Sequence, residues 1–416
     1  MSADETSQPW LRPRGSNQIG MSQFNERVVL QAIRLHGSMP KADLARLTNL
    51  STQTISLIIA RLLEQGLVLK RAPLRGKVGQ PSVPIQLNPD GAFFIGIKIG
   101  RRSVDLLLID FTGQARERAS LSYRHPDPGT LFEQIEAMLK DLCAKLGTQR
   151  IERLVGIGVA APLGLGGWQK LLDSAPQQAS QWDRIDIRGR IQAMTGLPVA
   201  FAKDTIAACV AELVIGRGRS IPSFLYIFIG TFIGGGIVLN SALHAGLQGN
   251  AGAIGSLPLG LATEMPPLQL LNVASLFYLE RLYAAAGLDE NACYDARALQ
   301  APWLEHTEAW LEQAARAIAL AIGSTNCLLD LDSVIVDASA HPLLRERVLA
   351  AIATALERYS WEGVQRPALH AGTVGADARA IGAALLPLHA NFAPDQELFL
   401  KILRVAPPQT ARFGAV

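Results

Sequence analysis

The 416-residue sequence lacks the features that mark membrane and secreted proteins. No apolar run approaches the about 18 residues that a transmembrane helix needs. The N-terminus, MSADETSQPW, has neither the basic nor the apolar region of a signal peptide. We therefore expect a cytoplasmic protein that does not associate with a membrane.

Cysteine is scarce, and its placement argues against two kinds of site. The four cysteines lie far apart and form no CxxC pair: Cys143, Cys209, Cys293 and Cys327. Neither a disulfide framework nor a thiolate zinc site is indicated. The default expectation is four small buried hydrophobic side chains, with no metal and no cofactor in the protein.

Aromatic residues are also few, at 6% of the chain, whereas 49% is hydrophobic and glycine occurs 37 times. This composition is typical of an α/β protein with alanine-rich helices. The length allows two or three domains, each with a sizeable core.

Positive charge is concentrated near the N-terminus. Residues 1–89 hold 11 Lys and Arg against 5 Asp and Glu, a net charge of +6, and the remaining residues carry −3. A small basic domain on a nearly neutral protein favours a partner with a phosphate backbone.

Residues 38–68 within this basic region predict two short helices joined by a tight turn. The first follows Pro40 and ends near Asn49. Ser51 is a suitable N-cap for the second, and apolar residues then follow at the spacing of one buried helical stripe: Ile55, Ile58, Ile59 and Leu62.

The second helix has a polar face suited to the major groove of DNA. We expect this face and the cap to contact DNA through Ser51, Thr52, Gln53, Thr54, Ser56 and Arg61. Gln53 and Thr54 are the best candidates for reading bases, although the apolar Leu57 on the same face weakens this assignment. An ordinary helical hairpin with a polar outer face is the alternative.

A strand from Leu67 to Leu69 leads into a basic segment, LKRAPLRGKVG, after Gly66 ends the helix. Such a segment is typical of a wing that lies on the DNA backbone. Its expected phosphate contacts are Lys70, Arg71, Arg75 and Lys77. A supporting helix is expected from Asn17 to Leu35.

Beyond Ala92 the pattern changes to alternating strands and helices, typical of α/β layers. Two hairpin-like strand pairs are expected, AFFIGIKIGRRSVDLLLID and FLYIFIGTFIGGGIVLNSAL, and each is followed by a helix-rich stretch. Expected helices include 130–146, 185–195, 205–216 and 376–388. Because the strand-strand-helix order occurs twice, the sequence is consistent with a duplicated, two-lobed fold.

At this point the chain resembles the ROK family of sugar kinases and sugar-responsive repressors, which have the actin-like ATPase (RNase H-like) fold. The resemblance spans about residues 17–390. It rests on five segments in order: NLSTQTIS, GIGVAAP, PVAFAKD, GTFIGGGIVLNSALHAGLQGNAGAIGSLP and GADARAIGAALL. The glycine-rich fourth segment is the most specific of these, and the helix-turn-helix points to the repressor branch.

The resemblance also implies which groups a kinase of this family needs. These are an Asp-x-Gly-Gly-Thr phosphate turn, an Asn-Asp pair that binds sugar and supplies the base, a second glycine loop for phosphate, and a Glu and a zinc-binding His in AGEIGH.

This sequence departs from that pattern at nearly every position. The first turn has Lys98, Gly100, Arg101 and Arg102 without a carboxylate or threonine, and the Asn-Asp pair is Lys203-Asp204. In the second glycine loop, Phe232 stands where the family has glycine, and its side chain should impede close approach of a phosphate. Ala253 and Ser256 replace the Glu and His. Asp337 stands near the adenosine site, where the family usually has glycines. We expect no catalytic residue here: Asp204 is a remnant of the base position, or only a cap for the following helix.

The replacements give the expected cleft between the lobes a cationic character. We expect ligand contacts from Lys98, Arg101, Arg102, Lys203, Asp204, Ala253 and Ser256. Such a cleft favours an anionic ligand, such as a sugar acid or sugar phosphate. In the alternative, Lys203 pairs with Asp204 and the arginines are solvated hairpin residues.

The sequence thus predicts a repressor of carbohydrate-related genes that binds a double-stranded DNA operator and a sugar-derived effector. The resemblance implies a homodimer or homotetramer. An ATP-dependent sugar kinase and a repressor controlled by a protein partner are the alternatives. The expected domains are a disordered N-terminus (1–16), a winged helix-turn-helix (17–89), a ROK domain (90–390) and a C-terminal tail (391–416). The first lobe of the ROK domain comprises about 92–204 with 376–390, and the second comprises 205–375.

Overall fold

The computed structural model describes residues 18–73, 83–123, 126–162, 182, 184–262 and 266–394. The chain divides into two units, with boundaries between Leu87 and Asn88 and between Asn391 and Phe392. The predicted disordered segment 1–16 and all but the first residues of the predicted tail 391–416 lie outside the described residues.

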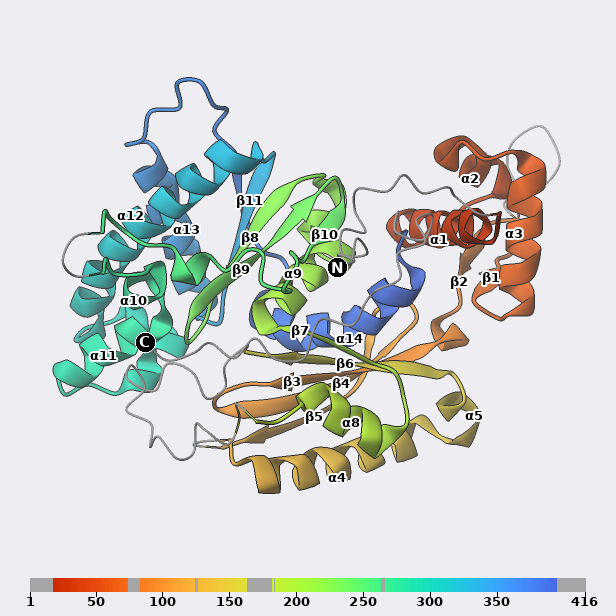
Figure 1. Ribbon diagram of the computed structural model, residues 1–416, viewed down its shortest axis with the longest axis horizontal. Helices are drawn as coiled ribbons and strands as arrows, with labels where there is room; N and C mark the ends of the chain where they lie inside the picture. Colours follow the sequence, from red (N-terminus) through yellow and green to blue (C-terminus); the bar gives the residue numbers. More distant parts are fainter. Residues whose placement is uncertain are drawn as a thin grey trace, which may run out of the picture. The chain divides into compact units, whose positions relative to one another are not determined.

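The first unit is a winged helix-turn-helix (Figure 1). Its elements are α1 (Gln18–His36), α2 (Lys41–Thr48), α3 (Thr52–Glu64), β1 (Val68–Lys70) and β2 (Ile85–Leu87). The predicted apolar stripe of α3 is buried, from Ile55 to Leu62, and β1 pairs antiparallel with β2. The segment directly before Asn88 is therefore the second strand of the wing.

The second unit contains two five-stranded sheets with one repeated topology. In the first sheet, with order β5-β4-β3-β6-β7, the first three strands form an antiparallel meander and the last two run parallel to β3. In the second sheet, with order β10-β9-β8-β11-β12, the same arrangement surrounds β8. The predicted duplicated, two-lobed fold is therefore confirmed.

In the first lobe, helices cover one face of the sheet (Figure 1). The strands are β3 (Phe93–Ile99), β4 (Ser103–Asp110), β5 (Ala115–Ser122), β6 (Leu154–Ala161) and β7 (Val199–Lys203), and the helices are α4 (Pro128–Leu146), α5 (Thr148–Ile151) and α8 (Ile187–Thr195). Apolar side chains of the sheet, α4 and α8 form one buried core that includes Ile97, Ile135 and Ile191.

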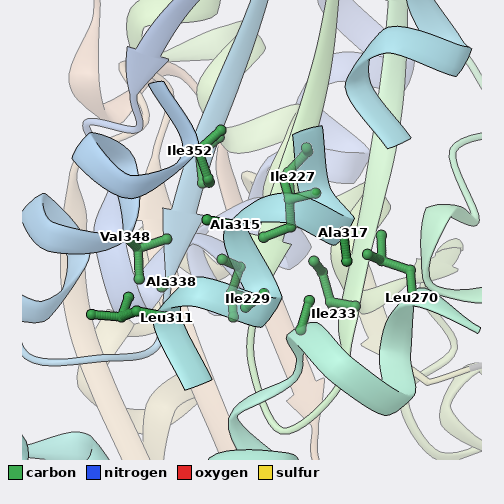
Figure 2. Close-up of a cluster of buried hydrophobic side chains, with 14 of the residues drawn as sticks. Ile227, Ile229, Ile233, Leu270, Leu311, Ala315, Ala317, Ala338, Val348 and Ile352 are labelled. Carbon is green, nitrogen blue, oxygen red and sulfur yellow. The ribbon is translucent and has the colours of Figure 1, made fainter. Parts of the chain in front are cut away.

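The second lobe buries its sheet under a layer of helices. Its strands are β8 (Phe224–Ile229), β9 (Ile233–Leu239), β10 (Ala242–His244), β11 (Ser333–Ala338) and β12 (Ala368–Ala371), and its helices are α10 (Leu270–Ala274), α11 (Leu276–Ala285), α12 (Trp303–Leu329) and α13 (Pro342–Leu356). Figure 2 shows Ile227 and Ile229 of β8 packed among Leu311 of α12 and Val348 and Ile352 of α13.

Two further helices lie between the two sheets (Figure 1): α9 (Asp204–Val214) and α14 (Ala378–Phe392). Glycines permit their close packing. A Cβ on Gly158 of β6 would lie 1.8 Å from the carbonyl oxygen of Ala383 in α14, and one on Gly382 would lie 1.8 Å from that of Ala207 in α9. The middle layer thus joins the first sheet to α14 and α14 to α9 by backbone contact. Single-turn 3-10 helices complete the unit: Pro89–Gly91, Arg217–Ser220, Ile254–Ser256, Glu290–Tyr294, Ala296–Leu299 and Gly375–Asp377.

Several sequence expectations need correction. The helix expected at 205–216 begins one residue earlier, at Asp204, and ends at Val214, while the closing helix runs on to Phe392. Only Cys209 and Cys293 are buried, whereas Cys143 is half-buried and Cys327 is exposed. None of the helices among the described residues is long and apolar enough to span a membrane.

The contact between α9 and α14 predicts opposite effects for two glycine substitutions. Gly382→Ala should lower the free energy of unfolding by about 1–3 kcal/mol or more, because the new methyl group forces the two helices apart. Gly323→Ala, within α12, should raise it by up to about 1 kcal/mol, since nothing lies within 4 Å of the added Cβ and alanine favours the helix. Urea unfolding followed by circular dichroism measures both. Equal stability of the two variants would contradict this packing.

Candidate functional site

The start of α3 carries the predicted DNA-contacting residues. Ser51 caps the helix, and its Oγ accepts the amide of Thr54 at 3.1 Å and lies 2.8 Å from the Thr54 hydroxyl. These two side chains therefore hold the helix start. Thr52, Gln53 and Ser56 are exposed beside them, which leaves Gln53 as the longest polar side chain at this end of α3.

Two other features of α3 bear on the predicted face. Leu57 is 61% exposed, so an apolar side chain does lie among the polar ones. Arg61 turns toward α1, where its guanidinium pairs with Glu26 at 2.9 Å and donates to Ser22 at 3.2 Å. In this structure Arg61 joins α3 to α1.

The wing contributes Lys70 and Arg71, both exposed. The Nε of Arg71 donates to Gln86 on the neighbouring strand, which orients the guanidinium along the wing. Arg75 and Lys77 lie outside the described residues.

In the second unit a cavity of about 200 Å³ opens between the two lobes. Five of the seven predicted ligand contacts line it: Arg101, Lys203, Asp204, Ala253 and Ser256. Other residues that line the cavity were not expected from the sequence, among them Thr231, Asn250 and Arg379.

Lys98, by contrast, does not line the cavity. Its ammonium pairs with Asp105 at 3.0 Å and donates to Ser103 at 2.8 Å. The antiparallel register of β3 and β4 places Lys98 opposite Asp105, so a local partner already binds this charge.

Arg102 is also absent from the cavity lining, because it binds the other lobe. It makes two hydrogen bonds to the carboxylate of Glu280 in α11, at 3.1 and 2.9 Å. Glu280 is buried and also accepts the hydroxyl of Tyr294 at 2.6 Å. In this structure, Arg102 therefore forms an ion pair between the lobes, and its side chain remains 48% exposed.

Arg379 brings an additional positive charge to the cavity from the first turn of α14. Its guanidinium lies 3.5 Å from Asp204, donates to Ser339 at 3.0 Å and lies 4.9 Å above the ring of Phe228. Lys203 Nζ lies 3.5 Å from the side-chain oxygen of Asn250. The ion pair of Asp204 is thus with Arg379 and not, as the alternative had it, with Lys203.

Asp204 occupies the first position of α9, one residue inside the expected capping position. Its Oδ1 accepts the amide of Thr205 at 2.9 Å, while its carboxylate also lines the cavity. Both the structural role and the ligand role considered from the sequence remain compatible with this position.

Burial lowers the pKa of three cations in or beside the cleft. Desolvation lowers the pKa of Lys203 and of Arg101, and the nearby charge of Asp204 offsets part of each shift. Desolvation and then the charge of Arg379 lower the pKa of Lys98. An anion in the cleft would stabilise the charged forms.

The loop that corresponds to the kinases' second glycine loop is occupied by internal contacts. Phe232 packs edge-on against Phe277 with ring centroids 5.7 Å apart. The guanidinium carbon of Arg101 lies over the Phe232 ring, 5.0 Å from its centroid. The amide of Ile233 donates to the buried hydroxyl of Ser275 at 3.0 Å. A phosphate would need such amides as donors, and this one is already bonded.

Asp337, near the expected adenosine site, is also bound within the protein. Its carboxylate accepts the amide of Gly375 at 2.8 Å and pairs with Arg345 at 3.1 Å. Among the described residues, no group of three or more His, Cys, Asp or Glu side chains is arranged to hold a metal ion.

Comparison with known families gives the class of the protein. Residues 94–390 match the ROK family, and residues 25–68 match a winged helix-turn-helix DNA-binding family. The first match covers well over half of the chain. The chain therefore belongs to the ROK family, as the sequence predicted.

Characterised relatives are distant. The xylose repressor of Bacillus subtilis (strain 168) is 25% identical over 243 residues, which cover 58% of this chain and 62% of the relative. A transcriptional regulator of Mycobacterium tuberculosis (strain H37Rv) is 27% identical over 348 residues, covering 78% and 77%. The chain therefore spans less than two thirds of the length of the xylose repressors it matches.

Solved structures share the fold. A ROK family transcriptional regulator described as a homologue of the Escherichia coli MLC protein has a TM-score of 0.68 at 19% identity, covering 90% of this chain and 98% of that one. A ROK hexokinase from Thermus thermophilus has a TM-score of 0.52 at 24% identity, covering 71% and 97%.

The ion pair between Arg102 and Glu280 predicts a measurable contribution to stability. Arg102→Met leaves a buried carboxylate with fewer partners, so the free energy of unfolding should fall by about 1–3 kcal/mol. The low end of that range applies because the Arg102 side chain is 48% exposed. Urea unfolding is the measurement.

The matched control is Arg316→Met, which breaks an exposed pair with Glu312 on α12 and should cost no more than about 0.5 kcal/mol. A double-mutant cycle with Glu280→Gln isolates the pair itself. A coupling energy near zero would exclude a stabilising contact between the lobes at this position.

Proposed function

We propose that this protein is a transcriptional repressor of carbohydrate-related genes. In this proposal the winged helix binds an operator in double-stranded DNA, and the ROK domain binds a sugar-derived effector without transferring phosphate. The observation that carries it is the combination of an exposed polar helix start with a ROK cleft whose phosphate-binding positions hold cations and Phe232.

The proposal for DNA binding rests on the geometry of α3. Side chains at the N-terminal end of a recognition helix reach base edges in the major groove. Gln53 is exposed at that end, and an amide can bond adenine in two places. Lys70 and Arg71 on the wing are suited to phosphate contacts, which fix position without reading sequence. Arg61 and the two wing residues Arg75 and Lys77 stay predictions.

The proposal that the ROK domain is not a kinase rests on charge. Phosphoryl transfer requires metal ions and donors that stabilise the developing negative charge. Arg101 lies in the turn where the resemblance expects a carboxylate near metal-bound phosphate. Lys203 replaces the Asn of the sugar-binding Asn-Asp pair, and Ala253 replaces the sugar-binding Glu. Asp204 alone would supply a base but no metal site.

The relatives support a regulator over an enzyme. The Bacillus subtilis protein is named a xylose repressor and the mycobacterial one a transcriptional regulator. Two recognition helices in a homodimer or homotetramer would match a palindromic operator. A regulator of this kind would act in the cytoplasm, where its DNA target is.

Fluorescence anisotropy against duplexes tiling the region upstream of the protein's own gene tests the proposal. We expect one duplex to bind at least ~1000-fold more tightly than random DNA, with an affinity that falls steeply as salt rises. Sequence-blind binding together with steady ATP turnover on a sugar would replace the repressor by the kinase. Release of the operator by cell extract but by no sugar would favour a protein partner.

Gln53→Ala should weaken binding to the specific duplex by about 1–3 kcal/mol while leaving binding to random DNA nearly unchanged. The melting temperature should not move, because the side chain is exposed. Gln65→Ala, the same change at the exposed far end of α3, is the control and should leave both affinities unaltered. An equal loss in the two variants would rule out base recognition by Gln53.

A further inference from the structure

One apolar side chain of α3 lies outside the buried stripe of that helix. The residues of the stripe are Ile55, Ile58, Ile59 and Leu62, and all four are buried. Leu57 lies on the opposite side of the helix and is 61% exposed. A single exposed leucine is common on protein surfaces, so the surroundings of Leu57 decide what it means.

Leu57 belongs to the face of α3 that carries the proposed base reader. Gln53, Leu57 and Ala60 are all exposed, and they follow one another at intervals of four and three residues. Side chains at these spacings are neighbours on one face of a helix. Because the methyl group of Ala60 is short, Leu57 extends beyond it. Gln53 and Leu57 therefore project side by side from α3.

The charged group one turn further along α3 is bound elsewhere. Arg61 follows Leu57 by one helical turn. Its guanidinium pairs with Glu26 of α1 at 2.9 Å and donates to Ser22 at 3.2 Å. The charge of Arg61 is thus drawn toward α1, and the exposed surface of Leu57 adjoins an uncharged amide and a methyl group.

The charge of this part of the chain favours DNA as the molecule that covers the face. Residues 1–89 carry a net charge of +6, and Lys70 and Arg71 are exposed on the wing. Two copies of such a domain repel each other, whereas the phosphates of DNA attract it. We therefore expect Leu57 to lie against a base and not against a second copy of the chain.

One base offers an apolar group in the major groove. Thymine presents its C5-methyl group there, whereas the edges of adenine, guanine and cytosine present hydrogen-bond donors and acceptors. A leucine placed against a polar edge would leave donors or acceptors without a partner, which costs free energy. Leu57 is therefore complementary to thymine, just as the amide of Gln53 is complementary to adenine.

We propose that Leu57 recognises a thymine of the operator by packing against its C5-methyl group. Residues 53 and 57 are about 6 Å apart along the helix axis, and successive bases of a strand are about 3.4 Å apart, so the thymine lies within about two base pairs of the base that Gln53 binds. This inference rests on the proposed function, since it names a specificity-determining residue of the same DNA-binding site.

The test removes the methyl group from the DNA and leaves the protein unchanged. Fluorescence anisotropy is measured at one salt concentration for the full-length protein and its tightest-binding duplex, with each thymidine replaced in turn by deoxyuridine. We expect one replacement, or one in each half-site of a palindrome, to weaken binding about fourfold, because one methyl group is then missing from the contact.

Leu57→Ala assigns that methyl group to this side chain. The variant should bind the unmodified duplex about fourfold or more weakly, and it should lose most of the difference between thymidine and deoxyuridine at that position alone. Its melting temperature should not change, because the side chain is exposed. Leu47→Ala makes the same change at a 48% exposed leucine of α2. This matched control should keep the whole deoxyuridine pattern.

A scan in which no deoxyuridine weakens binding would overturn the inference, and so would an unchanged pattern in Leu57→Ala. Equal loss of affinity for specific and random duplexes, together with a smaller assembly in light scattering, would place Leu57 in a contact between copies and would also overturn it. Selection of one duplex is measured independently of the scan. Selective binding with a flat scan therefore removes this inference alone, whereas a protein that selects no duplex loses the proposed function as well.

Discussion

The backbone contact between α9 and α14 is the constraint on which the second unit depends. Gly382 brings α14 against the carbonyl of Ala207, and Gly158 brings the first sheet against α14. A side chain at either glycine would separate the layers. Because both helices begin at the cleft, this close packing also brings the first turn of α14 to the first turn of α9, where Arg379 meets Asp204 at 3.5 Å. The packing of the core and the chemistry of the cavity therefore have one cause.

A second contact between the lobes is made by side chains and not by the backbone. Arg102 leaves a tight turn and binds a buried carboxylate of α11. Glu280 also accepts a hydrogen bond from the hydroxyl of Tyr294, which helps to hold its carboxylate in place. Because Glu280 is buried, loss of the arginine would leave its carboxylate without a compensating charge. The lobes are thus joined by the closely packed helix layer and by polar contacts that include this half-exposed ion pair.

Much of the architecture could be predicted from the sequence because it rests on local patterns. The spacing of Ile55, Ile58 and Leu62 fixed the buried face of α3, and the repeated strand-strand-helix order matched the two sheets of equal topology. The cleft was harder. Lys98 and Arg102 were expected in it because they follow the first strand, but strand register gave Lys98 a partner in Asp105, and Arg102 found Glu280 across the lobes. Arg379 was missed because its approach to Asp204 depends on the packing of α14, which no local pattern specifies.

The cationic residues of the cleft disfavour binding of a catalytic metal ion and favour binding of an anion. A metal ion bound to phosphates needs carboxylates around it, and a cluster of arginine and lysine repels it. Under the proposed function, the same cluster favours binding of an anion over metal-dependent phosphoryl transfer. Phe232 also disfavours phosphate binding, because its side chain occupies the glycine loop. Its ring centroid lies 5.0 Å from the guanidinium carbon of Arg101. Asp204 is compatible with both chemistries, because a carboxylate that accepts a sugar hydroxyl in a kinase accepts the same hydroxyl in a binding site. Retention of Asp204 therefore carries little weight for or against an enzyme.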